Sequence, residues 1–264
     1  MTKLSNIQAF LLDMDGTVYL GPRVLPGAVE FIAYLQASRT PFLFLTNNPS
    51  ADAAYYSDKL SGMGIQTGPE HILTAGAATA AYVMRETPYR KVYVLGTPCF
   101  EGELERAGVT LTYENPDAVV ISFDKTLTYA KLERACLLLR EGLPYIATNP
   151  DRVCPTEYGY IPDCGAIAAL IESATGRRPA YIGKPEAAFA RMALDRLGVQ
   201  AEHTAMVGDR LYTDVEMARR AGLAGILVLS GETSRADLDV AEQQPDFVFE
   251  SVGALHRAWR DEAP

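Results

Sequence analysis

The stretch AFLLDMDGTVYLG, from Ala9 to Gly21, joins an apolar run to two carboxylates. Its first four residues are apolar, as expected of a strand that is covered by helices on both faces. Asp13 and Asp15 follow, one residue apart, and Gly16 permits a sharp exit from the strand. Two like charges this close together cost free energy unless a cation lies between them or one of them is protonated. The stretch therefore predicts a buried strand that ends in a functional site.

Short apolar runs of this kind recur along the chain and alternate with helical patterns. Helical periodicity is expected over residues 27–38 and 185–197, and Gly198 ends the second of these helices. Strand and helix in alternation predict an α/β fold with a doubly wound, Rossmann-like parallel sheet. The remaining strands are expected over residues 41–46, 91–96, 117–122, 144–149, 179–183, 203–209, 224–230 and 246–249.

The order of the strands suggests how the chain is divided into domains. Strands that end in reactive side chains fall near residues 13, 46, 184 and 209, whereas the stretch between the second and third of these supplies strands without such ends. We therefore expect residues 1–78 and 180–264 to form the core and residues 79–179 to form an inserted, smaller α/β module.

Bulk composition excludes several classes of protein. A formal charge of −9 in 264 residues, with no basic run, argues against a nucleic-acid partner. No run approaches the roughly 20 apolar residues of a membrane-spanning helix, and we do not expect the N-terminal residues to form a signal peptide. The four cysteines show no CxxC spacing and are expected to be reduced thiols, so we expect a cytoplasmic protein.

The ends of four core strands carry side chains that suit phosphoryl transfer. Asp13, Asp15 and Asp209 offer the hard oxygen ligands that Mg²⁺ prefers, and this ion would offset their charges. Lys184 supplies a positive point charge just before a helix. Thr46, with the asparagine that follows it, supplies neutral hydrogen-bond donors. Together they could hold a phosphoryl group while one carboxylate attacks phosphorus and another moves a proton.

The motifs DMDGT, TNN, GKP and GDRLYTD resemble, in this order, the four motifs of the haloacid dehalogenase superfamily. Similarity of ATNPDRVCPTEYGYIPDCGAI and ILVLSGET extends the likeness to its NagD-type, p-nitrophenylphosphatase-like members, which carry a large α/β cap between the second and third motifs. The resemblance implies a Mg²⁺-dependent phosphatase for small nucleotide, sugar or aryl phosphates, and it adds the expectation of a homodimer formed through the cap.

The resemblance also implies roles for individual residues. Asp13 would be the nucleophile and a metal ligand, and Asp15 would be the general acid/base, with its backbone carbonyl on the metal. Thr46, Asn47 and Lys184 would bind the phosphoryl group. The remaining candidates are Asp209 as a metal ligand, Asp214 in the outer shell of the metal, and Asp151, Arg152, Tyr160 and Arg210 as contacts of the substrate.

Other interpretations remain open at this point. The DxDG pattern could belong to a calcium loop, although Gly16 comes too early for one. Asp209 and Asp214 could cap the helix that follows them. A phosphomutase of the same superfamily, or a regulatory protein that binds phosphate and metal without turnover, could also use this residue set. A dehalogenase is disfavoured because a departing halide needs no proton, which would leave Asp15 without a role.

Overall fold

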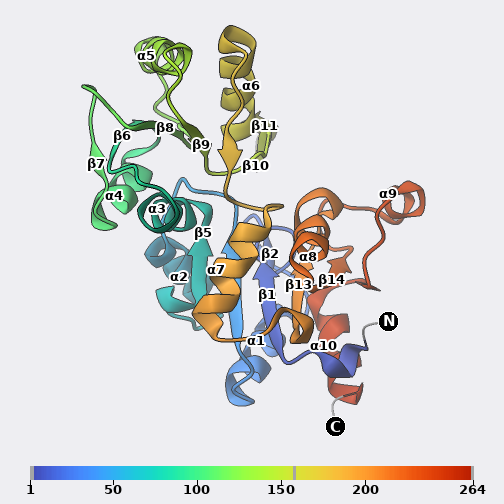
Figure 1. Cartoon of the computed structure of the whole chain (residues 1–264). Helices are drawn as coiled ribbons and strands as arrows, with labels where there is room; N and C mark the ends of the chain where they lie inside the picture. The colour runs from blue at the N-terminus through green and yellow to red at the C-terminus, as the bar shows by residue number, and fades with distance from the viewer. Residues whose placement is uncertain (1–2, 157–158, 263–264) are drawn as a thin grey trace. The chain divides into compact units, whose positions relative to one another are not determined.

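The structure is a computed structural model that describes residues 3–156 and 159–262. The chain divides into two compact units, each built around its own sheet (Figure 1). The first unit consists of Met1–Thr46, Ala54–Leu73 and Lys184–Pro264, and the second of Asn47–Ala53 and Thr74–Gly183. The main segment of the second unit, Thr74–Gly183, extends a few residues beyond each end of the range 79–179 expected for the inserted module, and the segment Asn47–Ala53 lies outside that range.

The first unit contains a six-stranded sheet in the order β15-β14-β13-β1-β4-β5. Its strands are β1 (Ala9–Asp13), β4 (Phe42–Thr46), β5 (Ile72–Thr74), β13 (Thr204–Gly208), β14 (Ala224–Val228) and β15 (Phe247–Phe249). The pairings of β1 with β13 and β4, of β13 with β14, and of β14 with β15 are all parallel. Every residue of β1, β4, β13 and β14 is buried, which confirms the expected α/β fold with helices on both faces.

Helices cover both faces of this sheet. The helices of the first unit are α1 (Ala28–Ala37), α2 (Ala53–Gly62), α7 (Ala187–Leu197), α8 (Glu216–Ala221), α9 (Arg235–Val240) and α10 (Val252–Glu262). On one face, Phe10 of β1 makes edge-to-face contacts with Phe31 of α1 and Trp259 of α10, at centroid distances of 5.3 and 4.8 Å. Such pairs each contribute about 0.5–1.5 kcal/mol beyond area burial. On the other face, α7 packs against α8.

A pair of glycines lets α1 and α10 approach this closely. A β-carbon on Gly27 would lie 2.3 Å from the Cα of Gly253, so neither position accepts a side chain without displacing the backbone. Gly27 also has a φ of 80°, which glycine adopts at little cost.

The second unit contains a five-stranded sheet in the order β12-β9-β8-β6-β7, with all four pairings parallel. Its strands are β6 (Lys91–Leu95), β7 (Thr110–Leu111), β8 (Ala118–Ile121), β9 (Tyr145–Ala147) and β12 (Ala180–Tyr181). Its helices are α3 (Ala75–Glu86), α4 (Pro98–Arg106), α5 (Tyr129–Arg140) and α6 (Cys164–Thr175).

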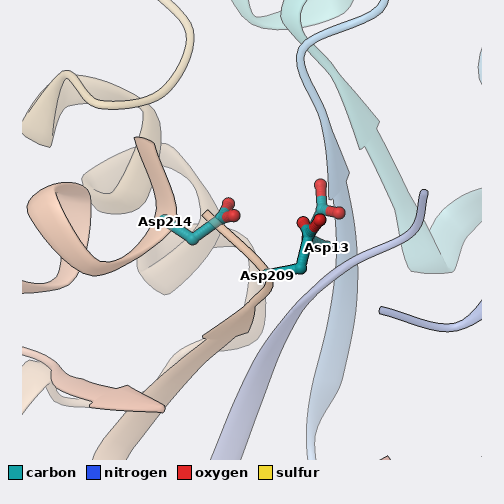
Figure 2. A group of neighbouring side chains, drawn as sticks. All are labelled: Asp13, Asp209 and Asp214. Atoms are coloured by element: carbon teal, nitrogen blue, oxygen red, sulfur yellow. The ribbon is translucent and has the colours of Figure 1, made fainter. Parts of the chain in front are cut away.

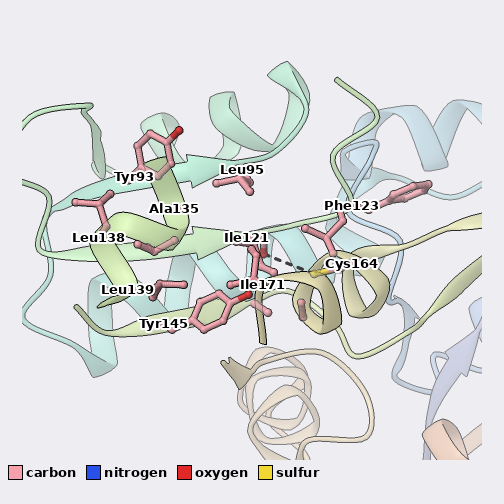
Figure 3. Packing of buried hydrophobic residues seen from close by; sticks show 14 residues of the cluster. Tyr93, Leu95, Ile121, Phe123, Ala135, Leu138, Leu139, Tyr145, Cys164 and Ile171 are labelled. Atoms are coloured by element: carbon pink, nitrogen blue, oxygen red, sulfur yellow. Dashed lines mark hydrogen bonds between the residues drawn. The ribbon is translucent and has the colours of Figure 1, made fainter. Parts of the chain in front are cut away.

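Alternate residues of this sheet face a core that α5 and α6 cover (Figure 3). Leu95 and Ile121 belong to that core, together with Leu138 of α5 and Ile171 of α6. The Cys164 thiol donates to the carbonyl oxygen of Ile121, at 3.8 Å, where α6 begins. The unit therefore has a hydrophobic core of its own.

Two short antiparallel hairpins interrupt the parallel pattern. They pair β2 (Tyr19–Leu20) with β3 (Arg23–Val24) and β10 (Val153–Thr156) with β11 (Gly159–Pro162). Neither was expected from the sequence, because all four strands are short and β3, β10 and β11 are largely exposed. In the part of the chain that the structure describes, no helix is both long and apolar enough to cross a membrane.

Candidate functional site

Parallel pairing brings three of the expected strand ends to one edge of the first sheet. Asp13 is the last residue of β1 and is in register with Leu45 of β4, so Thr46 follows at the same edge. On the other side of β1, β13 ends at Gly208, and Asp209 comes next. The edge formed by the carboxyl ends of parallel strands is where ligands bind in folds of this class.

Three carboxylates gather at this edge (Figure 2). Asp13, Asp209 and Asp214 each offer an oxygen atom, and these atoms all lie within 4.8 Å of one another. The three residues are 8%, 2% and 1% exposed, respectively. Asp214 reaches the cluster from a single wide helical turn, Leu211–Val215, which directly precedes α8.

Glycines make room for two of these carboxylates. A β-carbon on Gly16 or Gly231 would lie 2.3 or 2.0 Å from Oδ2 of Asp209, and one on Gly208 would lie 2.2 Å from Cγ of Asp214. Gly16 also has a φ of 89°, which residues with a side chain rarely adopt. The glycine of DMDGT is thus required both for the turn of the backbone and for the position of Asp209.

Lys184 is the positive partner of this cluster. It is 3% exposed, and its Nζ donates to Oδ1 of Asp13 and, at 2.7 Å, to Oδ1 of Asp214. Burial opposes the charge of Lys184, but the two carboxylates raise its pKa above the ordinary value. The lysine therefore remains charged at neutral pH.

For Asp13 and Asp209, the same environment favours the neutral form. Burial raises the pKa of Asp13 to about 6, although Lys184 acts to lower it. Burial, followed by repulsion from Asp13 and Asp214, raises the pKa of Asp209 well above its usual range. Without a further cation, the cluster thus resists full ionisation.

Asp209 provides the clearest test of whether a metal ion fits the cluster. Its Oδ2 accepts a hydrogen bond from the Glu232 amide at 2.7 Å. Its Oδ1 is buried and accepts none from any residue that the structure describes, and a buried acceptor without a partner is costly. Three carboxylates against one lysine leave two negative charges when all are ionised. This donor set fits a hard divalent cation that binds oxygen ligands.

Asp15 is not part of the three-carboxylate cluster. Its side chain is exposed, and its backbone forms a bridge with Tyr19 in the turn that leaves β1. The surrounding chain desolvates the carboxyl group and raises its pKa, while Lys59 and Arg210 act to lower it. Lys59 lies with its Nζ 3.8 Å from the centre of the Tyr19 ring. An exposed carboxyl group can exchange protons with solvent.

The other expected residues fall into two groups. In the first unit, Thr46 is buried at the end of β4, and Arg210 forms an ion pair with Glu232 at 2.8 Å. The Arg210 amide also donates to Asp214, at 3.1 Å.

In the second unit, the side chains of Asn47 and Asp151 bond to each other at 2.9 Å. Arg152 and Tyr160 are exposed on and beside the β10–β11 hairpin, and Tyr160 is 72% exposed.

The sequence interpretation assigned no role to the segment after β14. Ser230 donates to the Gly16 carbonyl at 2.8 Å, and the next two residues contact Asp209. Its position in the sequence could have indicated a role in the site, because this segment also follows the carboxyl end of a core strand.

Comparisons with known proteins give consistent matches over nearly the whole chain. The family described as haloacid dehalogenase-like hydrolase matches residues 10–110, and the one described as HAD-hydrolase-like matches residues 181–255. The chain is 38% identical over 250 residues to the acid sugar phosphatase of Staphylococcus haemolyticus (strain JCSC1435), covering 94% of this chain and 95% of that protein.

Two solved structures show the same architecture. One is the 4-nitrophenylphosphatase from Thermotoga maritima, with 46% identity and a TM-score of 0.94 over 97% of this chain and 98% of that one. The other is NagD from E. coli K-12, with 34% identity and a TM-score of 0.88 over 96% of this chain and 98% of that one.

Proposed function

Because the chain belongs to the haloacid dehalogenase-like hydrolases, among their NagD-like phosphatases, we propose that it hydrolyses small phosphomonoesters with Mg²⁺ through an aspartyl-phosphate on Asp13. Membership confirms the family resemblance and the hydrolase class. The metal, the covalent intermediate and the roles of individual residues are the proposal.

The position of Asp13 is the observation that carries this proposal. Its carboxylate lies at the end of β1 and accepts from Lys184, and it retains some exposure, which a nucleophile requires. With a pKa of about 6, most of the Asp13 population is ionised at neutral pH. An ionised carboxylate held beside a lysine can form a bond to phosphorus while the bond to the ester oxygen breaks.

The phosphoryl group needs charge compensation on several sides. Lys184 supplies a fixed positive charge next to the nucleophile, and Thr46 and Asn47 supply hydrogen-bond donors for phosphoryl oxygens. Asp13 and Asp209, with the Asp15 carbonyl, would hold Mg²⁺, and Asp214 would orient its water shell. When bound, the ion supplies positive charge that offsets the carboxylates and the phosphoryl oxygens.

Asp15 would move the protons in both halves of the reaction. In the first half it gives a proton to the ester oxygen as the alcohol leaves. In the second half it takes a proton from water, whose oxygen attacks phosphorus and releases Asp13 and inorganic phosphate. Desolvation raises the pKa of Asp15, which is the direction that favours a general acid.

The second unit would select the alcohol part of the substrate. We assign it the role of the cap, with Arg152 and Tyr160 as contacts of the leaving group, because exposed polar and aromatic side chains on a hairpin are suited to binding. The names of the relatives support sugar and aryl phosphates as the first substrates to test. The four free cysteines support action in the reducing cytoplasm. A homodimer formed through this unit is a prediction that light scattering would test.

The experiment is phosphate release from p-nitrophenyl phosphate, measured with Mg²⁺ and with EDTA. We expect activity only with the ion. Asp13→Asn should abolish turnover, because an amide is not a nucleophile, whereas Asp195→Asn, at an exposed site on α7, should leave turnover unchanged. Full activity in EDTA would contradict the metal assignment. No turnover with any ester of a broad phosphate panel would contradict the proposed function as a whole.

A further inference from the structure

The Asp151 carboxylate lies in a hydrogen-bonded network that connects it to Asn47. Its Oδ2 accepts from Nδ2 of Asn47 at 2.9 Å and from Nδ2 of Asn149 at 3.2 Å. Asn47 and Asp151 are 104 residues apart in the sequence, and both belong to the second unit. The carboxylate is therefore directed at two protein amides.

Further hydrogen bonds within the second unit hold Asp151 and its neighbour Asn149 in place. The Gly165 amide donates to the Asp151 carbonyl at 2.7 Å. Asn149 is fully buried, and its Nδ2 also donates to Asp163, at 3.2 Å. Asp163 is 4% exposed and caps the first turn of α6. The loop after β9, residues 148–152, thus holds the Asp151 carboxylate towards Asn47 and Asn149.

Asn47 is confined on its other side by Gly183. A β-carbon at Gly183 would lie 2.6 Å from Oδ1 of Asn47. Rotating the amide by half a turn would place its oxygen against Asp151, which can only accept hydrogen bonds when ionised. An oxygen acceptor at position 151 therefore favours the orientation in which Nδ2 of Asn47 faces Asp151 and Oδ1 lies on the side of Gly183.

We propose that Asp151 is a positioning residue, which holds the Asn47 amide in the orientation needed to bind a phosphoryl oxygen. This inference rests on the proposed function, in which Asn47 binds the phosphoryl group. It gives Asp151 a role different from contact with the leaving group, and it couples loop 148–152 to phosphate binding.

Inorganic phosphate is the probe that isolates this role, because it carries no leaving group. We expect Asp151→Ala to raise the inhibition constant of phosphate about tenfold, the order expected for loss of one charge-assisted hydrogen bond. Asp151→Asn keeps an oxygen acceptor for both amides, so it should restore most of the affinity. Should Asp151→Ala fail to fold, Asp151→Ser, which is too short to reach Asn47, takes its place.

Three alternatives give different results. If Asp151 acted only through its negative charge, both the Ala and Asn variants would bind phosphate more tightly than the wild type. If it only contacted the leaving group, the constant for phosphate would stay unchanged while selectivity among esters shifted. If it only stabilised the loop, Asp163→Ala would raise the constant as much as Asp151→Ala does. We expect Asp163→Ala to lower the melting temperature without changing the constant.

Failure of this inference can be distinguished from failure of the proposed function. Turnover of p-nitrophenyl phosphate by Asp151→Ala with an unchanged or lowered phosphate constant overturns this inference and leaves the proposed function intact. A wild-type protein that neither turns over phosphate esters nor binds phosphate overturns both.

Discussion

Replacing Lys184 by methionine should destabilise the first unit in a way that depends on both pH and metal. The change removes the buried cation that pairs with Asp13 and Asp214, and it leaves three carboxylates within 4.8 Å. At that distance each pair repels by about 3 kcal/mol for an effective dielectric constant of about 20. Removing one partner of a buried ion pair costs about 3–5 kcal/mol in general. We therefore expect the free energy of unfolding to fall by about 3–5 kcal/mol at pH 8 in EDTA.

The sign of the pH effect follows from the carboxylates. Without Lys184 their pKa values rise further, so the folded state binds protons more tightly than the unfolded state does, and the deficit should shrink as the pH falls towards 5. Added Mg²⁺ should also shrink it, because an ion bound only to the folded state stabilises that state.

Urea denaturation followed by fluorescence would measure this effect. Trp259 is the only tryptophan of the chain and packs on Phe10 of β1, so its emission reports on the first unit. Lys3→Met, at an exposed position of the same unit, is the matched control and should change little. A Lys184→Met deficit below about 1 kcal/mol, the usual value of an exposed ion pair, would refute the reasoning. A loss of unfolding free energy that did not change with pH or with added Mg²⁺ would also refute the reasoning.

Three further predictions concern other parts of the molecule. Asp15→Asn should lower turnover of alkyl phosphates about 10²–10⁴-fold in steady-state assays, and a small effect would assign the proton to another group. Gly231→Ala should weaken Mg²⁺ binding in calorimetric titration, because the new β-carbon would lie 2.0 Å from Oδ2 of Asp209, and unchanged affinity would argue against Asp209 as a ligand. Burial raises the pKa of Glu103 from 4.5 to about 7, so the folded state holds this proton more tightly and loses up to about 3 kcal/mol of stability between these pH values. Glu103→Gln should reduce the dependence of stability on pH in this range, as measured by scanning calorimetry. An unchanged dependence on pH would contradict the raised pKa of Glu103 as its cause.

Much of the first sheet could be predicted because its strands are short apolar runs without alternation. Burial on both faces requires such runs, and the parallel pairing that follows from them brings Asp13, Thr46 and Asp209 to one edge. The strands that escaped prediction are short or exposed. Ile72–Thr74 is buried but has only three residues, Thr110–Leu111 has only two, and Val153–Thr156 is mostly exposed.

The parts of the site that could not be predicted depend on side-chain directions. Sequence spacing places Asp151 in a loop, but it does not show that the carboxylate accepts from Asn47 rather than facing a ligand. The contact of Gly231 with Asp209 joins two segments through the absence of a β-carbon, which no residue pattern reveals. Both features arise from tertiary packing.

Capture of the covalent intermediate tests the central claim most directly. Nitrophenolate leaves without needing a proton, whereas attack by water needs a base, so Asp15→Asn should accumulate phosphorylated protein when it is mixed with p-nitrophenyl phosphate and Mg²⁺. Rapid quenching and peptide mass spectrometry would then locate the phosphoryl group. We expect it on the peptide that contains Asp13. A phosphoryl group on another residue, or none while the wild-type protein turns over the same ester, would contradict covalent catalysis by Asp13.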